Sequence, residues 1–185
     1  MLTVLVIDES RARAGEICAG LALAGYQVAA ILAGADNLTA EVEKRQPDVI
    51  LIDTDSTSRD TLENLAAMNK DMPRPVVIFT QEDGRETIRD AVRAGVSAYV
   101  VDGLDPKRIK PIVEVARARF EDTQALRREL DEISQKLSDR KLVDKAKGVL
   151  MKARGLDEEA AYHAMRKLAM ERGQTMAKVA RDVID

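Results

Sequence analysis

Five short apolar runs alternate with amphipathic stretches through the first hundred residues, and this alternation constrains the fold more than any other feature. The runs cover residues Leu2–Ile7, Tyr26–Leu32, Val49–Asp53, Pro75–Thr80 and Ser97–Val101. Helical patterns separate them near residues 10–24, 36–45, 57–70 and 84–94. Nearly continuous aliphatic segments such as VLVI, VILI and VVIF are typical of parallel strands buried on both faces. The sequence therefore predicts an α/β domain over residues 1–115, with a doubly wound, five-stranded parallel sheet.

The pattern changes after Val101, because residues 105–185 contain no strand candidate. One helical register runs without Gly or Pro from Ile112 to Lys147. Apolar residues follow a seam with spacings of three and four residues, which Arg119 and Thr123 interrupt, at Ile109, Ile112, Ala116, Leu126, Leu130, Ile133 and Leu137. We expect residues 112–140 to form a coiled-coil linker that joins two copies as a parallel homodimer. The alternative is one helix of a monomeric bundle.

The last segment, residues 140–185, predicts a small three-helix domain. Its helices are expected near residues 140–153, 157–171 and 175–184, with Gly148, Gly155 and Gly173 as punctuation. A methionine stripe at helical spacing is more often core than binding surface. The expected core is therefore aliphatic and methionine-rich: Val143, Ala146, Leu150, Met151, Ala161, Met165, Leu168, Met170, Met176, Val179 and Ala180.

Charge and composition narrow the class of protein. The net charge of −3 divides into 13 basic and 19 acidic side chains over residues 1–116, and 16 basic and 13 acidic over 117–185. This skew permits a nucleic-acid partner for the C-terminal part without demanding one. The single Cys18 excludes an internal disulfide and fits a reducing compartment. With no signal-peptide pattern and no membrane-length apolar run, we expect a cytoplasmic protein without a membrane partner.

Acidic residues gather where the predicted strands end. Asp8 and Glu9, Asp53 with Asp55, Thr80, and Asp102 all fall at carboxyl ends of strands, where open parallel sheets bind ligands. Carboxylates such as Asp8, Glu9 and Asp53 suit Mg²⁺, although no cofactor is required. A carboxylate beside such an ion can accept a phosphoryl group. We therefore expect an acidic pocket made of Asp8, Glu9, Asp53, Thr80 and Asp102.

These motifs resemble the receiver domain of two-component response regulators over about residues 1–115. The Ile-Asp-Glu end of the first strand matches the acidic pair, and "PDVILID" matches the strand of the phospho-acceptor, which would be Asp53. "VVIFT" matches the strand that carries the switch residue, here Thr80, and "AGVSAYVV" matches the segment before the essential lysine. The resemblance implies a receiver-like fold with Asp53 as its acceptor-like residue.

The match fails at one position. Receivers carry Lys followed by Pro where this chain has Asp102 followed by Gly103. A carboxylate there repels phosphoryl oxygens, by about 4 kcal/mol for unit charges about 4 Å apart at an effective dielectric of 20. We therefore favour a pseudo-receiver that serves as a protein-binding scaffold. Phosphorylation of Asp53 as the signal is the alternative.

The C-terminal segment carries a second pattern. Six basic residues between Arg140 and Arg154 oppose only Asp139 and Asp144, so a helix face that meets phosphates and an ordinary solvated face are both open. The spaced elements "AKGVLM", "EEAAY", "MRKLAM" and a closing "VA" are similar to the ANTAR domain of antiterminators in the AmiR/NasT group. The segment "AYVVDGL" is similar to the NasT branch of that group, which responds to nitrate and nitrite.

The ANTAR resemblance implies a set of RNA-binding residues: Arg140, Lys145, Ala146, Lys147, Gly148, Met151, Tyr162 and Arg166. Arg and Lys side chains meet phosphates, and Gly148 permits close backbone approach. Tyr162 stacks on an unpaired loop base in one interpretation and is a core aromatic in the other. The single His163 has no Cys or second His near it, so a surface or satisfied histidine is favoured over a metal ligand.

Together these resemblances imply an RNA-binding transcription antiterminator. It would bind tandem hairpins in leader mRNA, and a nitrate/nitrite-sensing partner would sequester it. The alternative is a DNA-binding response regulator activated by phosphorylation of Asp53, in which the short helices form a helix-turn-helix. An enzyme is not expected, because the sequence lacks a His/Asp metal cluster, a nucleophile–base pair and a Gly-rich phosphate loop.

Overall fold

The computed structural model describes residues 1–8, 14–103 and 105–185, which form two compact units, Met1–Thr123 and Gln124–Asp185. The strands are β1 Thr3–Asp8, β2 Gln27–Leu32, β3 Val49–Asp53, β4 Val76–Thr80 and β5 Ala98–Val101. The helices are α1 Ala14–Leu23, α2 Leu38–Arg45, α3 Arg59–Asp71, α4 Arg85–Arg93, α5 Ile109–Arg154, α6 Glu158–Arg172 and α7 Met176–Ile184. None of these described helices combines the length and apolar character that crossing a membrane requires.

The first unit contains one parallel sheet with strand order β2-β1-β3-β4-β5. Strands β3 and β4 are buried along their whole length, as their continuous aliphatic sequence predicts. In the ladder between β1 and β3, Asp8 is the register partner of Asp53. The predicted doubly wound α/β domain is confirmed, and α1 to α4, as far as they are described, begin and end within a few residues of their predicted bounds.

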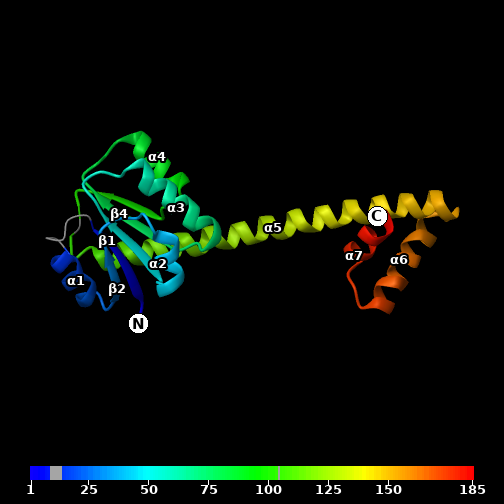
Figure 1. Ribbon diagram of the computed structural model, residues 1–185, viewed down its shortest axis with the longest axis horizontal. Coiled ribbons are helices and arrows are strands. Elements are labelled where there is room, and N and C mark those ends of the chain that lie inside the picture. Colours follow the sequence, from blue (N-terminus) through cyan, green and yellow to red (C-terminus); the bar gives the residue numbers. More distant parts are fainter. Residues whose placement is uncertain (9–13, 104) are drawn as a thin grey trace. The chain divides into compact units, whose positions relative to one another are not determined.

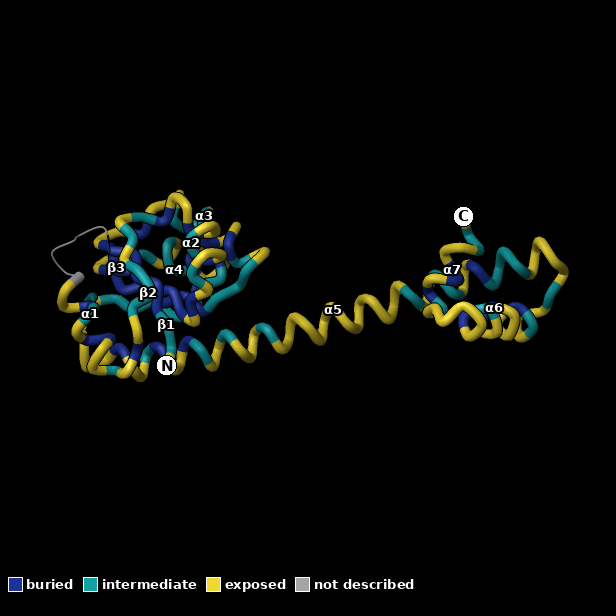
Figure 2. The backbone as a smooth tube through the Cα atoms, turned by 60° about the horizontal axis from the view of Figure 1, so that its bottom comes forward, coloured by how far each residue is buried: buried dark blue, intermediate teal, exposed yellow. Residues whose placement is uncertain are grey.

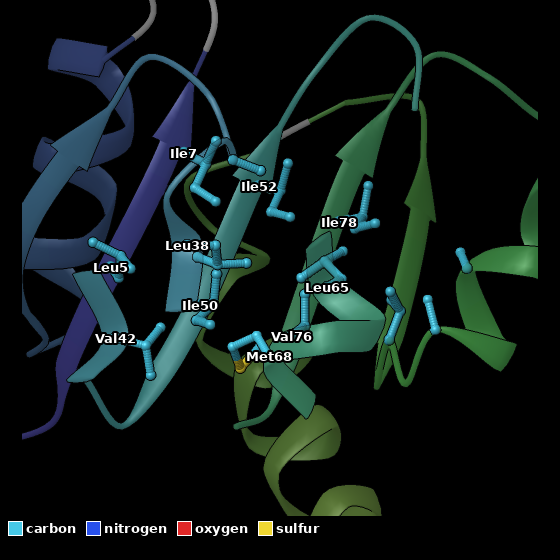
Figure 3. Packing of buried hydrophobic residues seen from close by; sticks show 14 residues of the cluster. Leu5, Ile7, Leu38, Val42, Ile50, Ile52, Leu65, Met68, Val76 and Ile78 are labelled. Atoms are coloured by element: carbon cyan, nitrogen blue, oxygen red, sulfur yellow. The ribbon is translucent and has the colours of Figure 1, made fainter. Parts of the chain in front are cut away.

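Helices cover both faces of this sheet (Figure 1). On one face, Leu38, Val42, Leu65 and Met68 of α2 and α3 pack against strand residues such as Ile50 (Figure 3). On the other face, α1 and the first turns of α5 cover the sheet, through a separate cluster that includes Ile17, Leu21, Ile109, Val113 and Ala116. The first turns of α5 are therefore part of the core of the first unit.

This packing corrects the predicted apolar seam of residues 109–137. Ile109 and Ala116 are fully buried against the sheet and Ile112 packs beside them, so this part is not available to a coiled coil. The later positions are exposed on α5 (Figure 2), at 62% for Leu126, 66% for Leu130, 55% for Ile133 and 54% for Leu137. Only Leu126–Leu137 therefore forms a continuous exposed apolar stripe, which we call the exposed seam.

The second unit folds around a small core of Ala146, Met165, Ala169, Val179 and Ala180, flanked by partly buried residues such as Val143, Leu150, Leu168 and Met176. The predicted first short helix is wrong as a separate element, because α5 continues through Gly148 to Arg154. A single helix position without a Cβ weakens a helix without ending it. Gly155 and Gly173 do follow helix ends, both with positive φ. Two predicted core residues, Met151 and Met170, are instead 38% and 75% exposed.

Candidate functional site

Three of the predicted pocket residues come together at the carboxyl edge of the sheet. Asp8, Asp53 and Thr80 are the last residues of β1, β3 and β4, and their exposed fractions are only 1%, 3% and 1%. Asp8 and Asp53 are directly paired across two neighbouring parallel strands. The sheet thus holds two buried carboxylates beside a buried hydroxyl. Glu9, another predicted acid of this pocket, lies outside the described residues.

Hydrogen bonds fix the Thr80 side chain in this structure. Its hydroxyl donates to the main-chain oxygen of Asp55 (3.1 Å) and accepts from the main-chain N–H of Glu82 (3.2 Å). The Glu82 carboxylate in turn accepts the Thr57 N–H at 3.0 Å and the Thr87 hydroxyl at 2.8 Å. The loop after β3 and the loop after β4 are therefore tied together beside Asp53. Glu82 carries no recognisable signal in the sequence, because its contacts with Thr57 and Thr87 are created by folding.

Asp102 takes a different position from the other pocket residues, since its side chain is exposed. Its φ is +74° and that of Gly103 is +75°, two consecutive left-handed residues. The Gly103 N–H donates to the main-chain oxygen of Thr80 at 3.2 Å, which holds this loop at the same edge of the sheet. Proline fixes φ near −65°, so this conformation excludes the proline found in receivers at the position of Gly103. Because Asp102 faces solvent, its repulsion of an anion at Asp53 is screened below the sequence-based figure.

The second unit exposes most of the residues that the ANTAR resemblance implied. Side-chain caps define the starts of α6 and α7: Asp157 accepts the Ala160 N–H at 2.7 Å, and Thr175 accepts the Lys178 N–H at 3.3 Å. Arg140, Lys145 and Arg166 are exposed. Met151 is 38% exposed and Tyr162 is 42% exposed, so Tyr162 is not a core aromatic.

Two of the implied RNA-binding residues, Ala146 and Lys147, are buried or largely covered. Ala146 is fully buried in the core, so its side chain cannot touch RNA in this conformation. The Lys147 ammonium lies 2.8 Å from Asp144 and 2.7 Å from Glu158, and only 15% of its side chain is exposed. Hydrogen bonds to Asp144 and then to Glu158 raise the pKa of Lys147. Lys147 thus links α5 to the first turn of α6, and its charge is already balanced.

The single histidine, His163, is exposed on α6. Its ring lies 3.7 Å from the carboxylate of Glu159 in an i,i+4 pair. Among the described residues, no group of three His, Cys, Asp or Glu side chains gathers to hold a metal ion. The described part of the acidic site therefore supplies two carboxylates, Asp8 and Asp53.

Comparison with known proteins assigns both units. Residues 4–114 match the response regulator receiver domain and residues 131–184 match the ANTAR domain. The transcriptional regulatory protein PdtaR of Mycobacterium tuberculosis (strain H37Rv) is 29% identical over 161 residues, which are 87% of this chain and 78% of that protein. The nitrate regulatory protein of Klebsiella oxytoca is 37% identical over 83 residues, which are 45% of this chain and 21% of that protein.

A solved structure shows the fold of the first unit independently. A CheY-like receiver domain from Methanospirillum hungatei JF-1 superposes with a TM-score of 0.58 at 21% identity, over 66% of this chain and 98% of that one. Receiver and ANTAR domains together form a non-enzymatic family, in agreement with the sequence analysis. Since the receiver match alone covers more than half of the chain, this protein belongs to the response regulators, as a member with a C-terminal ANTAR domain.

Proposed function

We propose that this response regulator is an RNA-binding transcription antiterminator whose ANTAR domain binds tandem hairpins in leader transcripts. The observation that carries the proposal is the ANTAR match over residues 131–184, joined in one chain to a receiver domain. A relative with the same span, PdtaR, is named a transcriptional regulatory protein. Bound at the hairpins, the protein prevents formation of the terminator, so transcription continues.

The proposed RNA contacts are the exposed members of the implied set. Arg140, Lys145 and Arg166 meet phosphates, and Arg166 lies one helical turn from Tyr162 on α6. The half-exposed Tyr162 ring is available to stack on an unpaired loop base, a contact worth roughly 1–3 kcal/mol. RNA-binding proteins read sequence mainly at such single-stranded loops. This arrangement supports recognition of hairpin loops over recognition of a duplex.

Dimerisation through the exposed seam is part of the proposal. Leu126, Leu130, Ile133 and Leu137 repeat at spacings of four, three and four residues, the spacing of a coiled-coil interface. A dimer presents two ANTAR domains, which engage two hairpins at once. Once the first hairpin is bound, the second binds as an intramolecular step, so the linked pair binds more tightly than either alone.

We further propose that a sensor partner, rather than phosphorylation, controls the receiver-like unit. The support is the carboxylate of Asp102 in place of the receiver lysine, followed by Gly103, whose φ of +75° excludes the proline of ordinary receivers. Similarity of 83 residues to a nitrate regulatory protein supports nitrate or nitrite as the signal that the partner senses. The partner sequesters the protein until the signal releases it.

A magnesium ion at the acidic edge is compatible with this control. Asp8 and Asp53 are hard oxygen donors at neighbouring strand ends, so they fit two positions of a Mg²⁺ site. When bound, the ion supplies charge neutralisation for an anion at Asp53. A Mg²⁺ titration of the wild type and of Asp53→Asn, followed by thermal stability, tests this site. Equal stabilisation of both proteins contradicts it.

The test of the main proposal is fluorescence anisotropy of the full chain with a labelled RNA that bears two short stem-loops. The controls are the same RNA with changed loop bases and a DNA duplex of equal length. The expected result is loop-dependent binding at least tenfold tighter than binding to the duplex. Equal or tighter binding to the duplex refutes the antiterminator proposal and favours the DNA-binding regulator.

A further inference from the structure

A groove with a volume of about 650 Å³ lies between α3 and α4 of the first unit, and we call it the α3–α4 groove. The two helices are neighbours on one face of the sheet (Figure 1), where both contribute to the same core cluster. Ligand sites in proteins commonly measure about 300–1,000 Å³, so the groove has the volume of a binding site. Neither the acidic pocket nor the candidate RNA-binding residues account for it.

Apolar side chains line one part of the α3–α4 groove. Leu62 and Ala66 come from α3, and Ala94 follows the last residue of α4. Leu62 and Ala66 are one helical turn apart, so they lie on the same side of α3. Leu62 is half-buried, whereas Ala66 is exposed. The alanine therefore leaves a space beside Leu62 that a longer side chain at the same position would fill.

Side-chain hydrogen bonds join the two walls of the groove at both ends. At one end the Glu82 carboxylate accepts the Thr57 N–H at 3.0 Å and the Thr87 hydroxyl at 2.8 Å, and both threonines line the groove. These bonds connect the residues before α3 to the first turn of α4. At the other end the Asn69 side chain of α3 donates to the main-chain oxygen of Ala94 at 2.8 Å. The distance between the walls is thus fixed, and a preformed site loses less entropy when it binds.

The charged side chains of the walls leave one carboxylate unbalanced. Arg59 Nε lies 2.7 Å from the Glu63 carboxylate on α3, and Arg93 Nη1 lies 3.2 Å from the Asp90 carboxylate on α4. The remaining charged residue of the lining, Glu86, is exposed and forms no ion pair within the part of the chain that the structure describes. Both cations of the groove are therefore neutralised, and Glu86 is left for a cation from outside.

This pattern favours a protein segment as the occupant. The unpaired carboxylate repels the phosphates of RNA, and a second copy of the same groove would place Glu86 against Glu86 around a two-fold axis. Six of the ten lining residues are exposed, so the groove is too open to enclose a small molecule. An amphipathic segment can cover such a groove with its apolar side chains. The 19 acidic and 13 basic side chains of residues 1–116 also attract a cationic partner.

We propose that the α3–α4 groove binds an amphipathic segment of a protein partner, with aliphatic side chains over Leu62 and Ala66 and a Lys or Arg opposite Glu86. This inference rests on the proposed control of the receiver-like unit by a sensor partner, and it gives that partner a docking site. Glu82 and Asn69 are positioning residues, since they hold the walls at a fixed distance without lining the groove.

The probe for the test is a library of short random peptides displayed on phage and selected against the immobilised full chain. The selected peptides are then synthesised with a fluorescent label, and their affinities are measured by anisotropy. We expect them to combine aliphatic residues with Lys or Arg. Ala66→Lys fills the groove, so it should weaken their binding by about tenfold or more.

Ala67→Lys is the matched control. Ala67 is the next residue of α3 and is also exposed, but it does not line the groove. The same substitution at both alanines should leave the melting temperature within a few degrees of the wild type, as at ordinary surface positions. Peptide affinity should remain at the wild-type value in Ala67→Lys and fall only in Ala66→Lys.

Two further variants test the charge and the fixed walls. Glu86→Gln keeps the size of the side chain but removes its charge, so it should weaken peptide binding about two- to fivefold, as the loss of an exposed ion pair does. Added salt should weaken binding to the wild type more than binding to Glu86→Gln. Glu82→Ala removes the bridge between the walls. It should accelerate hydrogen exchange of the Thr57 amide and lower peptide affinity, although Glu82 does not line the groove.

The RNA assay separates this inference from the function on which it rests. Ala66→Lys should bind the two-stem-loop RNA as tightly as the wild type. If no peptide is selected, or if the peptides bind Ala66→Lys and Ala67→Lys equally, the docking site is wrong while RNA binding by the wild type still supports the antiterminator. If the peptides map to the groove but the wild type does not bind the RNA, the antiterminator proposal fails and the docking site stands. If sedimentation shows that Ala66→Lys, but not Ala67→Lys, abolishes the dimer, the groove is a contact between two copies, and the inference is overturned.

Discussion

The exposed seam allows the dimer proposal to be tested with a single side chain. Leu130 stands in the middle of the seam, and 66% of its surface is exposed. In a parallel coiled coil, the same residue of two chains meets across the interface. Replacing Leu130 therefore removes apolar contact from both chains at once.

The size of the effect follows from the exposed area. Burying a whole leucine side chain contributes about 1.5–3 kcal/mol, so covering the exposed two-thirds of Leu130 contributes roughly 1–2 kcal/mol per chain. Leu130→Ala in both chains should thus weaken association by roughly 2–4 kcal/mol, about 30- to 700-fold in the dimer Kd. Leu130→Asp should weaken it further, because two like charges then face each other at the desolvated interface.

Sedimentation equilibrium over a range of concentrations measures this constant directly. Gln135→Asp is the matched control, because it introduces the same charge at an exposed residue on the opposite side of α5. We expect the control to change the dimer Kd by less than about threefold, as for an ordinary surface substitution. A wild type that remains monomeric at all concentrations refutes the reasoning. A Leu130→Asp variant as dimeric as the control refutes it equally.

Three further predictions concern the stability of each unit. Met165→Ala should lower the unfolding free energy by about 2–5 kcal/mol in urea titrations, because Met165 is buried. Met170→Ala, at the exposed surface, should change it by less than about 0.5 kcal/mol. Similar losses of stability for the two variants would contradict the observed core. Burial and the hydrogen bond that the Tyr26 hydroxyl donates to Glu114 raise the pKa of Tyr26 to about 12. The stability contributed by neutral Tyr26 is therefore complete below about pH 10 and lost as the pH rises towards 12. An absorbance titration should show a tyrosine that ionises late, and Tyr26→Phe should abolish this transition. A titration curve that the substitution leaves unchanged would contradict the raised pKa. Asp102→Val should destabilise the first unit by about 1–2 kcal/mol, because the φ of residue 102 is positive and a β-branched side chain is strained there. Asp102→Gly should not destabilise it. Equal melting temperatures for the two variants would count against backbone strain at this position.

The first unit could be predicted from sequence because its signals are local. Nearly continuous aliphatic runs mark β3 and β4 as strands buried on both faces, and parallel strands direct their carboxyl ends to one edge. Asp8, Asp53 and Thr80 follow from these two facts alone. The caps at Asp157 and Thr175 were predictable for the same reason, since each acts within its own first turn.

Other features depend on which surfaces meet after folding, and the sequence could not decide them. From their spacing alone, Ile109 and Leu130 were predicted to lie in one apolar seam. In the structure Ile109 is buried against the sheet and Leu130 is exposed. Met165 and Met170 have the same chemistry on the same helix, and only packing places one inside and one outside.

The same division holds for the candidate RNA surface. The basic character of residues 140–154 was determined by sequence, because charge is a property of composition. Tertiary structure decided which charges are available, since folding brings Glu158 of α6 to Lys147 while the neighbouring Lys145 stays exposed. Periodicity fixes the side of a helix on which a residue lies, but only the packed neighbours determine what that side can still bind.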